Sequence, residues 1–259
     1  FKGKSNKVEK KGWELTFSDE FDQGTLDKNK WTTQACGGLR FHPENIVDDN
    51  KAPTIYYSDD CFEFKDSIMR QLIKNVPIEI EYMDLDDNNY GKFTIPYQTG
   101  QIDCSNYFEQ KYGYFEIRSK ASAGKGVCSS FLMASNKLWP PEIDVYEICF
   151  DKKNRFESNF IWKSGGWDER NNRKKSKVHK ALDASEDFHI YAVEWNKNRF
   201  KIYYDNVLIR VFSNPKALSF FSFPMHLIIG VDVYENNNQK IENNQKYHEI
   251  DYVRVYNKK

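Results

Sequence analysis

Short segments in which apolar and polar residues alternate cover most of this chain. They are rich in Val, Ile, Tyr and Phe, and turn-forming residues such as Asn and Asp separate them. Alternation with a period of two is typical of β-strands that bury one face. The sequence shows neither the 3.6-residue period of a long helix nor an internal repeat. Strands are therefore expected at 13–17, 61–64, 67–73, 78–83, 112–120, 129–134, 142–150, 156–162, 188–195, 200–205, 207–212, 225–234 and 249–256.

This succession of short strands predicts an all-β protein, built as a single antiparallel β-sandwich of the jelly-roll type. A chain of 259 residues is long enough for one large sandwich. Residues 1–12 are polar and rich in lysine, so we expect a tail there, followed by one domain over 13–259. Two longer loops are expected, an acidic one at 84–92 and a basic one at 163–180.

The composition argues against two classes of partner. The 38 basic and 38 acidic residues give a net charge of zero, so no overall field favours nucleic acid. No apolar run reaches the length of a membrane span. Aromatic residues are frequent, with 19 Phe, 16 Tyr and 6 Trp. Most of these rings are expected to pack in the core, and the remainder could stack on sugar rings.

The five cysteines, at positions 36, 61, 104, 128 and 149, are too sparse for a disulfide scaffold and lack a CxxC metal spacing. Most are expected to be buried thiols, and one pair could form a bridge in an exported protein. The chain begins at Phe1 rather than Met. We therefore expect a targeting segment to have been removed, and a secreted, periplasmic or cell-surface location.

The segment from Trp139 to Glu147 carries the chemistry. It places three carboxylates, Glu142, Asp144 and Glu147, on one expected strand. Glu142 and Asp144 are two residues apart and share a face, whereas Glu147, five residues from Glu142, falls on the other face under strict alternation. One extra residue, a β-bulge at positions 145–146, would return Glu147 to the face of the other two. The core side of the strand is then expected to carry Ile143 and Ile148.

Three like charges on one strand face repel one another and separate their pKa values. Glycoside hydrolysis needs such a set, because one carboxylate acts as nucleophile while another stays protonated as the acid. The alternative is a solvated strand face that is acidic without a catalytic role.

The sequence resembles glycoside hydrolase family 16, the group of laminarinases, lichenases, agarases and carrageenases. The resemblance extends from Trp13 to Tyr256 and implies a curved β-jelly roll with an open cleft for a polysaccharide. We also expect a monomer that needs no cofactor. The matching segments are 15–21 (LTFSDEF), 111–118 (KYGYFEIR), 126–131 (GVCSSF), 142–147 (EIDVYE), 189–195 (HIYAVEW), 203–206 (YYDN) and 251–256 (DYVRVY).

The resemblance assigns a role to each carboxylate. Glu142 matches the nucleophile that forms the covalent glycosyl-enzyme. Glu147 matches the general acid that protonates the leaving oxygen and later acts as base on water. Asp144 matches the carboxylate that hydrogen-bonds the nucleophile and helps to set its ionisation.

Further residues match binding positions of the family. Trp139 is a candidate for stacking on a sugar ring, although a packing role suits it equally well. Asn159 and Trp162 are expected in the cleft, on the strand beside the carboxylates. The family often holds a structural calcium ion, for which Asp251 and, more weakly, Glu20 are the matching ligands. The alternative for Asp251 is a turn or salt-bridge contact.

The substrate signals conflict. The segment 127–131 (VCSSF) is similar to lichenases and favours a β-1,3- or mixed-linkage β-1,3/1,4-glucan, hydrolysed by a retaining endo-β-glycanase. The bulged motif and the basic run favour a sulfated galactan such as agar, porphyran or carrageenan. A non-catalytic glucan-binding module and a transglycosylase are further alternatives. The basic residues in question are Arg170, Arg173, Lys174, Lys175 and Lys177.

Overall fold

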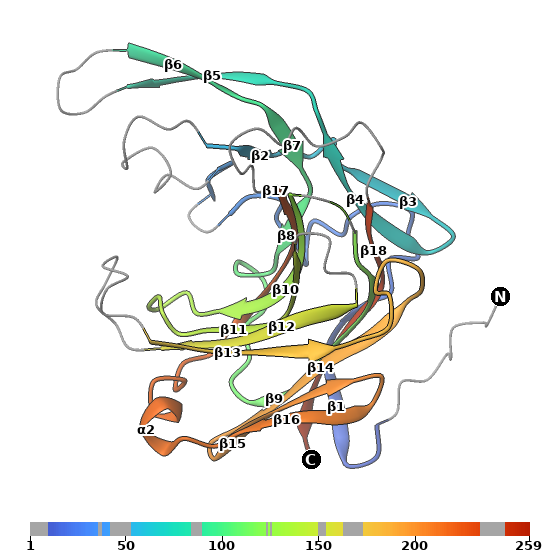
Figure 1. Cartoon of the computed structure of the whole chain (residues 1–259), viewed down its shortest axis with the longest axis vertical. Helices are drawn as coiled ribbons and strands as arrows, with labels where there is room; N and C mark the ends of the chain where they lie inside the picture. The colour runs from blue at the N-terminus through green and yellow to red at the C-terminus, as the bar shows by residue number, and fades with distance from the viewer. Residues whose placement is uncertain are drawn as a thin grey trace.

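The structure is a computed structural model that describes residues 10–35, 38–41, 53–83, 90–122, 124, 126–149, 154–162, 173–233 and 247–259. In this part of the chain the regular elements are the strands β1 to β18 and one short helix, α2 (Pro215–Leu218). Two large sheets and a separate hairpin contain all the strands (Figure 1). The predicted all-β fold is confirmed.

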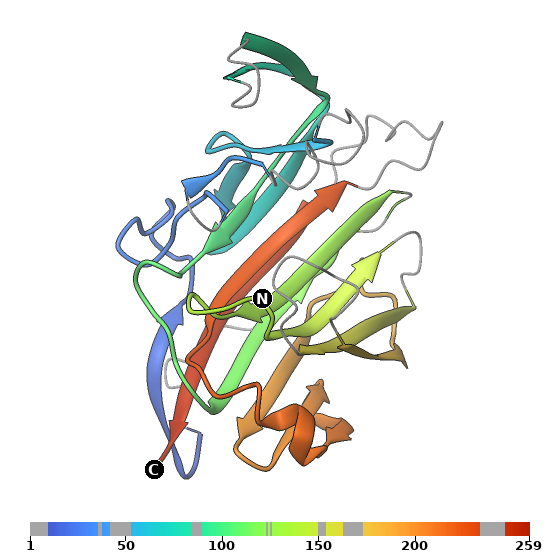
Figure 2. The same cartoon turned by 90° about the vertical axis from the view of Figure 1, so that its left-hand side faces the viewer.

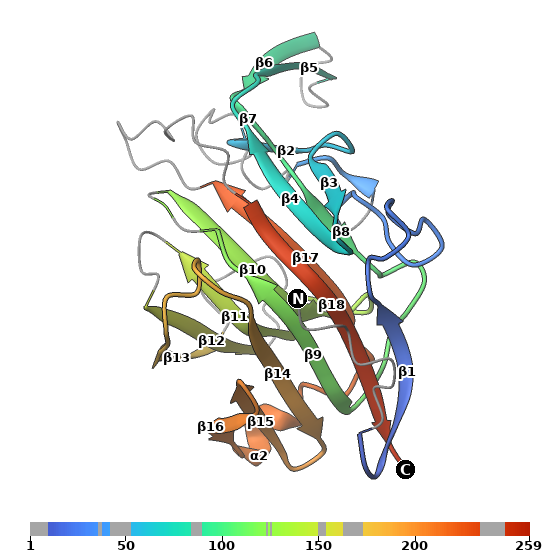
Figure 3. The ribbon, with the colours of Figure 1, turned by 90° about the vertical axis from the view of Figure 1, so that its right-hand side faces the viewer.

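The larger sheet has ten strands, and Figure 3 looks onto it, with β18 between β9 and β4. Strand β1 (Trp13–Asp19) pairs with β18, and β3 (Phe62–Lys65) pairs with β4. Only the pair β2–β7 is parallel among the described ladders of this sheet. The remaining order is β16 (Val207–Phe212), β15 (Arg199–Tyr204), β14 (His189–Asn196), β9 (Gly113–Lys120), β18 (Tyr247–Lys258), β4 (Ile68–Lys74), β7 (Tyr97–Thr99) and β2 (Ile55–Tyr57).

The smaller sheet has six strands, and all its described ladders are antiparallel. Figure 2 shows it with β17 beside β10. Its order is β13 (Arg173–Lys180), β12 (Arg155–Trp162), β11 (Glu142–Cys149), β10 (Val127–Ala134), β17 (His226–Val233) and β8 (Gln101–Asp103). Strands β5 (Ile78–Met83) and β6 (Tyr90–Ile95) form the separate hairpin.

The core lies between the two large sheets and is rich in aromatic rings. Phe160 of the six-stranded sheet stacks on Phe200 of the ten-stranded sheet, with ring centroids 4.6 Å apart. Trp31 and Trp195 are 1% exposed. Ile143 and Ile148 belong to this core, as predicted. Most aromatic residues in the core cluster therefore serve packing, which is the simpler of the two expectations for them.

Arg210 connects the outermost strands of the two sheets. It projects from β16 and donates to the backbone oxygens of Ser158 and Lys175. Its guanidinium lies 4.4 Å from the ring centroid of Phe160. Lys177 of β13 donates in return to the backbone oxygen of Ile209. Burial lowers the pKa of Arg210 to about 10, so the guanidinium stays charged near neutral pH.

The prediction of a basic loop at 163–180 is partly wrong. Residues 173–180 form strand β13, which pairs with β12 along eight positions, while residues 163–172 lie outside the described part. Of the predicted acidic loop, 84–89 lies outside it too, and 90–92 belongs to β6. The predicted tail is described only from Lys10, whose ammonium lies 3.4 Å from the ring centroid of Tyr114. No helix in the described ranges is long and apolar enough to cross a membrane.

Candidate active site

Strand β11 carries the three carboxylates and contains the predicted bulge. On the β10 side, Phe131 pairs with Tyr146 and the next residue, Leu132, pairs with Asp144, so Val145 is the extra residue. The β12 side shows the same shift between Asp144 and Glu147. Val145 and Tyr146 are both fully buried in the core. Two consecutive residues therefore point inward, and Glu147 returns to the outer face with Glu142 and Asp144.

We call this outer side of the six-stranded sheet the carboxylate face. Residues directly opposite each other in a ladder share a face. The pairings of Ser130 with Glu147 and of Asn159 with Asp144 therefore place both polar residues there. Continuing to β13, Ser176 pairs with Asn159 and Lys174 with Ile161, which brings Lys174 to the same face.

Trp139 lies directly before β11 and contacts the first carboxylate. Its indole Nε1 donates to Oε2 of Glu142 over 2.8 Å. The ring is half-buried, and a cis peptide bond joins it to Pro140. Trp139 is thus brought to the site as predicted, and its described contact is with Glu142; sugar stacking remains a prediction.

Asp144 is the most enclosed of the three carboxylates, with 2% of its surface exposed. Burial raises its pKa well above the usual value, and the charges of Glu142 and Glu147 raise it further. A hydrogen bond with Glu142 acts in the same direction. These effects favour the protonated form of Asp144, which can donate that proton to Glu142 in their hydrogen bond.

Glu147 is held by Asn159, whose side-chain Nδ2 donates to Oε2 over 2.6 Å. Burial raises the pKa of Glu147, and the positive charge of Lys174 opposes that rise. The carboxylates of Glu142, Glu157 and Asp232 raise it again. The net effect favours a protonated Glu147, which is the form that a general acid needs.

The prediction for Trp162 is wrong in its placement. Trp162 is three residues after Asn159, and strand alternation puts it on the opposite face. It packs against the core cluster, with its ring centroid 5.8 Å from that of Phe212. The residue of β12 opposite Glu142 is Ile161. Asn159 alone of the two predicted β12 residues reaches the carboxylate face.

Both carboxylates that the resemblance implies as calcium ligands form ion pairs in this structure. Asp251 is paired with Arg118. Glu20 accepts two hydrogen bonds from Arg254, each of 2.8 Å. Each carboxylate thus faces a guanidinium, as in the salt-bridge alternative weighed for Asp251. Calcium binding itself remains a prediction.

A buried hydrogen-bond chain, which the sequence did not reveal, lies beneath the bulge. The Tyr146 hydroxyl is 2.9 Å from Oγ of Ser119 and 2.6 Å from Nε2 of His248. On the other side of the imidazole, Nδ1 lies 2.8 Å from Oε1 of Gln71 and 3.2 Å from the Gly230 carbonyl.

The two acceptors beside Nδ1 assign the imidazole proton to that nitrogen. Nε2 then accepts from Tyr146, and the Tyr146 oxygen accepts from Ser119. Burial lowers the pKa of His248 to about 3, which keeps the ring neutral. The chain continues from Gln71 Nε2 to the Ile229 carbonyl over 2.7 Å. The second bulge residue is therefore anchored to both sheets.

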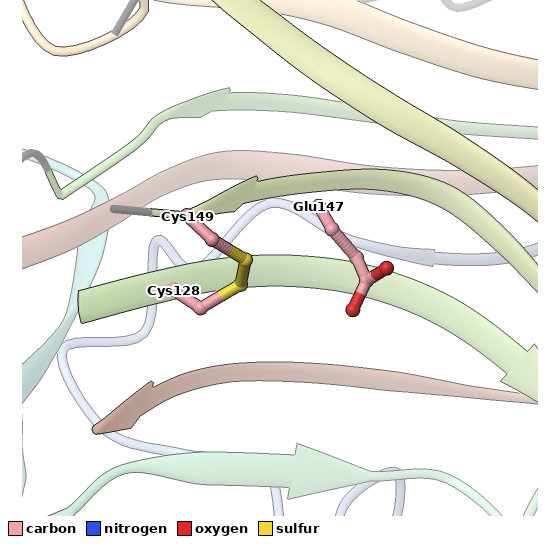
Figure 4. Close-up of side chains that lie close together, drawn as sticks. All are labelled: Cys128, Glu147 and Cys149. Carbon is pink, nitrogen blue, oxygen red and sulfur yellow. A yellow bond between two sulfur atoms is a disulfide. The ribbon is translucent and has the colours of Figure 1, made fainter. Parts of the chain in front are cut away.

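A disulfide lies next to Glu147. Cys128 of β10 and Cys149 of β11 are directly opposite each other and are bonded. Figure 4 shows the two sulfurs beside the Glu147 carboxylate. The expectation of a bridged pair is thus met at these two positions, and Cys61 and Cys104 are buried free thiols.

Comparison with known proteins identifies the family. Residues 74–254, more than half of the chain, match the family Glycosyl hydrolases family 16. The chain therefore belongs to this family, and the resemblance inferred from the motifs is confirmed.

Two curated relatives cover part of the chain. A beta-glucanase of Acetivibrio thermocellus is 32% identical over 126 residues, which are 46% of this chain and 34% of the relative. A putative xyloglucan endotransglucosylase/hydrolase protein 1 of Arabidopsis thaliana is 28% identical over 141 residues, 52% of this chain and 45% of the relative. The chain thus spans less than half the length of either relative.

Solved structures match almost the whole chain. The catalytic domain of an endo-1,3-beta-glucanase (laminarinase) from Thermotoga petrophila RKU-1 superimposes with a TM-score of 0.74 at 24% identity. The match covers 95% of this chain and 98% of that chain. At this identity the likeness establishes the fold, a jelly-roll-like sandwich.

Proposed function

We propose that this protein is a retaining endo-β-glycanase that hydrolyses a β-1,3- or mixed-linkage β-1,3/1,4-glucan. The observation that carries the proposal is the bulge at Val145, which puts Glu142, Asp144 and Glu147 on one face. An acidic surface patch would not need a bulge, an indole donor on Glu142 and an amide donor on Glu147. The relatives' names support a β-glucan substrate.

The reaction proceeds in two displacements. Glu142 attacks the anomeric carbon and forms an ester bond to the sugar, while the glycosidic bond breaks. Glu147 gives its proton to the departing oxygen in that step. Water then attacks the same carbon and releases Glu142, and the Glu147 carboxylate takes the proton of the water. The anomeric configuration is retained because the carbon is inverted twice.

The neighbouring residues set the charges for this sequence. Trp139 donates a hydrogen bond to the nucleophile Glu142, and the protonated form of Asp144 can donate a second one. Asn159 fixes the orientation of Glu147 and supports its anionic form between the two steps. An acid that must later act as a base benefits from both burial and a donor, because neither protonation state is then excluded.

Product analysis on purified polysaccharides tests the proposal. We expect laminarin or mixed-linkage glucan to yield oligosaccharides whose new reducing ends first appear in the β-configuration by NMR. Glu142→Gln should abolish turnover while the melting temperature stays within a few degrees. Initial release of α-products would contradict the retaining mechanism. Binding of glucan without turnover in the unmodified protein would instead favour the non-catalytic module.

A sulfated galactan is the second candidate, and Lys174 is the observation that favours it. Lys174 reaches the carboxylate face, where its ammonium could meet a sulfate ester. Arg173, Lys175 and Lys177 alternate with it and project from the opposite face. Of the four described residues of the basic run, Lys174 alone lies on the carboxylate face. This is weaker support than the five basic residues of the sequence, so the neutral glucan is the better proposal.

Transglycosylation uses the same covalent intermediate, with a sugar hydroxyl in place of water. The name of the Arabidopsis relative includes both activities. Adding a labelled oligosaccharide acceptor to the reaction separates the two outcomes, because only transfer extends the acceptor. We also propose export from the cell, because the disulfide between Cys128 and Cys149 is typical of an oxidising compartment.

A further inference from the structure

The disulfide on the carboxylate face lies within reach of a third metal-ligating group. The Sγ atoms of Cys128 and Cys149 and a carboxylate oxygen of Glu147 all lie within 4.8 Å of one another. In the described part of the chain this is the one group of three such ligands so close together. The three residues come from two adjacent strands, which hold them in register.

Reduction turns this group into a ligand set. A phosphine or thiol reductant supplies two electrons, the S–S bond breaks, and each sulfur takes up one proton to become a thiol. The two thiols remain directly opposite each other in the β10–β11 ladder. In a tetrahedral zinc site the Zn–S distance of ~2.3 Å places the two sulfurs about 3.8 Å apart. We expect the two Cys side chains to reach that separation by rotating about their Cα–Cβ bonds while the β10–β11 pairing is kept.

The donor types select the ion. Two thiolates and one carboxylate favour a borderline-soft divalent cation such as Zn²⁺ over Mg²⁺ or Ca²⁺, which prefer sets made entirely of oxygen. On binding, the two thiols release their protons. Water can complete the fourth position, because Cys149 and Glu147 are only half-buried.

We propose that the reduced protein binds one Zn²⁺ through Cys128, Cys149 and Glu147, and that the ion blocks the carboxylate used for proton transfer. The second part rests on the proposed function of Glu147, whereas the binding itself does not. The chain emerges from synthesis with its cysteines reduced, so all three ligands are available until the disulfide forms. Disulfide formation removes two of the three ligands and leaves Glu147 available.

Cobalt binding tests the site without any use of activity. The protein is reduced with a phosphine that contains no thiol, then titrated with Co²⁺ under anaerobic conditions. We expect one equivalent to bind with thiolate-to-cobalt charge-transfer absorption, and one equivalent of Zn²⁺ to abolish the signal. The oxidised protein should show no such absorption. An absent signal in the reduced protein, or an equal signal in the oxidised one, overturns the proposal.

Matched variants locate the signal. The two other described cysteines, Cys61 and Cys104, are buried, and Cys61→Ser/Cys104→Ser should keep the cobalt absorption. Cys128→Ser/Cys149→Ser should lose it. Glu147→Gln should keep the absorption, but its affinity for Co²⁺ should be at least about tenfold lower, since one of three ligands is lost. Unchanged affinity in Glu147→Gln would remove Glu147 from the site. Circular dichroism of each variant identifies any loss that comes from unfolding.

An activity measurement tests the second part. Each protein is compared with itself, reduced and metal-free against reduced with one equivalent of Zn²⁺. We expect the ion to lower turnover at least about tenfold in the unmodified protein, with recovery after chelation. In Cys128→Ser/Cys149→Ser, turnover with zinc should stay nearly equal to turnover without it. Cobalt binding with no loss of turnover on zinc would contradict the blocking of Glu147. Absent turnover in the oxidised, metal-free protein would contradict the proposed function instead.

Discussion

Asn159 donates a 2.6 Å hydrogen bond to Glu147 although its direct partner across the ladder is Asp144. The amide therefore reaches diagonally along the carboxylate face, past the extra residue of the bulge. It is the only described side-chain donor hydrogen-bonded to Glu147. The diagonal contact exists because the bulge moves Glu147 off the regular alternation.

The first prediction concerns Asn159→Ala. Loss of a donor to the carboxylate favours the protonated form, so the pKa of Glu147 should rise above its already raised value. The basic limb of the pH profile of kcat/KM, which reports loss of the acid proton, should then move to higher pH. Asn159→Asp should move it in the same direction. A basic limb that is unchanged in both variants would separate Asn159 from Glu147 in function.

The second prediction concerns Glu147→Ala. Hydrolysis of polysaccharide should fall by about 10²–10⁴-fold, because its sugar leaving group needs a proton. An aryl glycoside with an acidic phenol should lose much less in the first step. Added azide should partly restore release of the aryl group, since it can replace water as the second nucleophile. Equal losses on both substrates, with no azide effect, would count against Glu147 as the acid.

The third prediction concerns Tyr146→Phe. Removing the hydroxyl breaks both hydrogen bonds of Tyr146 in the chain under the bulge and leaves His248 without its donor. We expect kcat to fall while KM changes little, because the orientation of Glu147 loosens and the binding surface stays. Ser119→Ala removes one bond without touching β11 and should have a smaller effect on kcat. If both variants lose stability to the same extent and kcat is unchanged, the hydrogen-bond chain has a purely structural role.

The fourth prediction concerns acid stability. The pKa of His248 is lowered to about 3 and that of His179 to about 4 by burial, from 6.5 when unfolded. The unfolded state therefore binds protons below pH 6.5 that the folded state refuses, and stability should fall as pH drops from 6.5 towards 4. Melting temperatures across this range test it. His248→Gln should be less stable near pH 7 but show a shallower decline.

The fifth prediction separates the two substrate classes through neighbouring lysines. Lys174→Glu changes the charge on the carboxylate face, whereas Lys175→Glu changes it on the opposite face. With a neutral glucan, KM should be nearly equal in both variants. The basic limb of the pH profile of kcat/KM should also move to higher pH in Lys174→Glu, because a positive charge that lowers the pKa of Glu147 is lost. A large rise in KM for a sulfated galactan in Lys174→Glu alone would favour that substrate.

The sequence was most informative where side chains alternate strongly. The spacing of Glu142, Asp144 and Glu147 predicted the bulge, since three carboxylates can share a face in no simpler way. Strand β13 was missed because its lysines are exposed on both faces and give no apolar period. Trp162 was misplaced because the family resemblance put it in the cleft with Asn159, whereas their spacing of three residues puts them on opposite faces of a regular strand. The hydrogen-bond chain of Ser119, Tyr146, His248 and Gln71 joins residues from four strands, and the order of residues in the sequence does not show which of them meet.

Arg210 and Lys177 form hydrogen bonds between the outer strands β16 and β13. These bonds affect how readily the edges of the two sheets can pair with another molecule. An outer strand offers backbone groups to which a strand of another molecule could add. Arg210 donates a hydrogen bond to the Lys175 carbonyl of β13, and Lys177 donates one to the Ile209 carbonyl of β16. Each edge thus shields an acceptor of the other, beside the exposed Val207, Leu208 and Val211. Lys177 therefore covers part of the β16 edge whether or not a substrate meets β13.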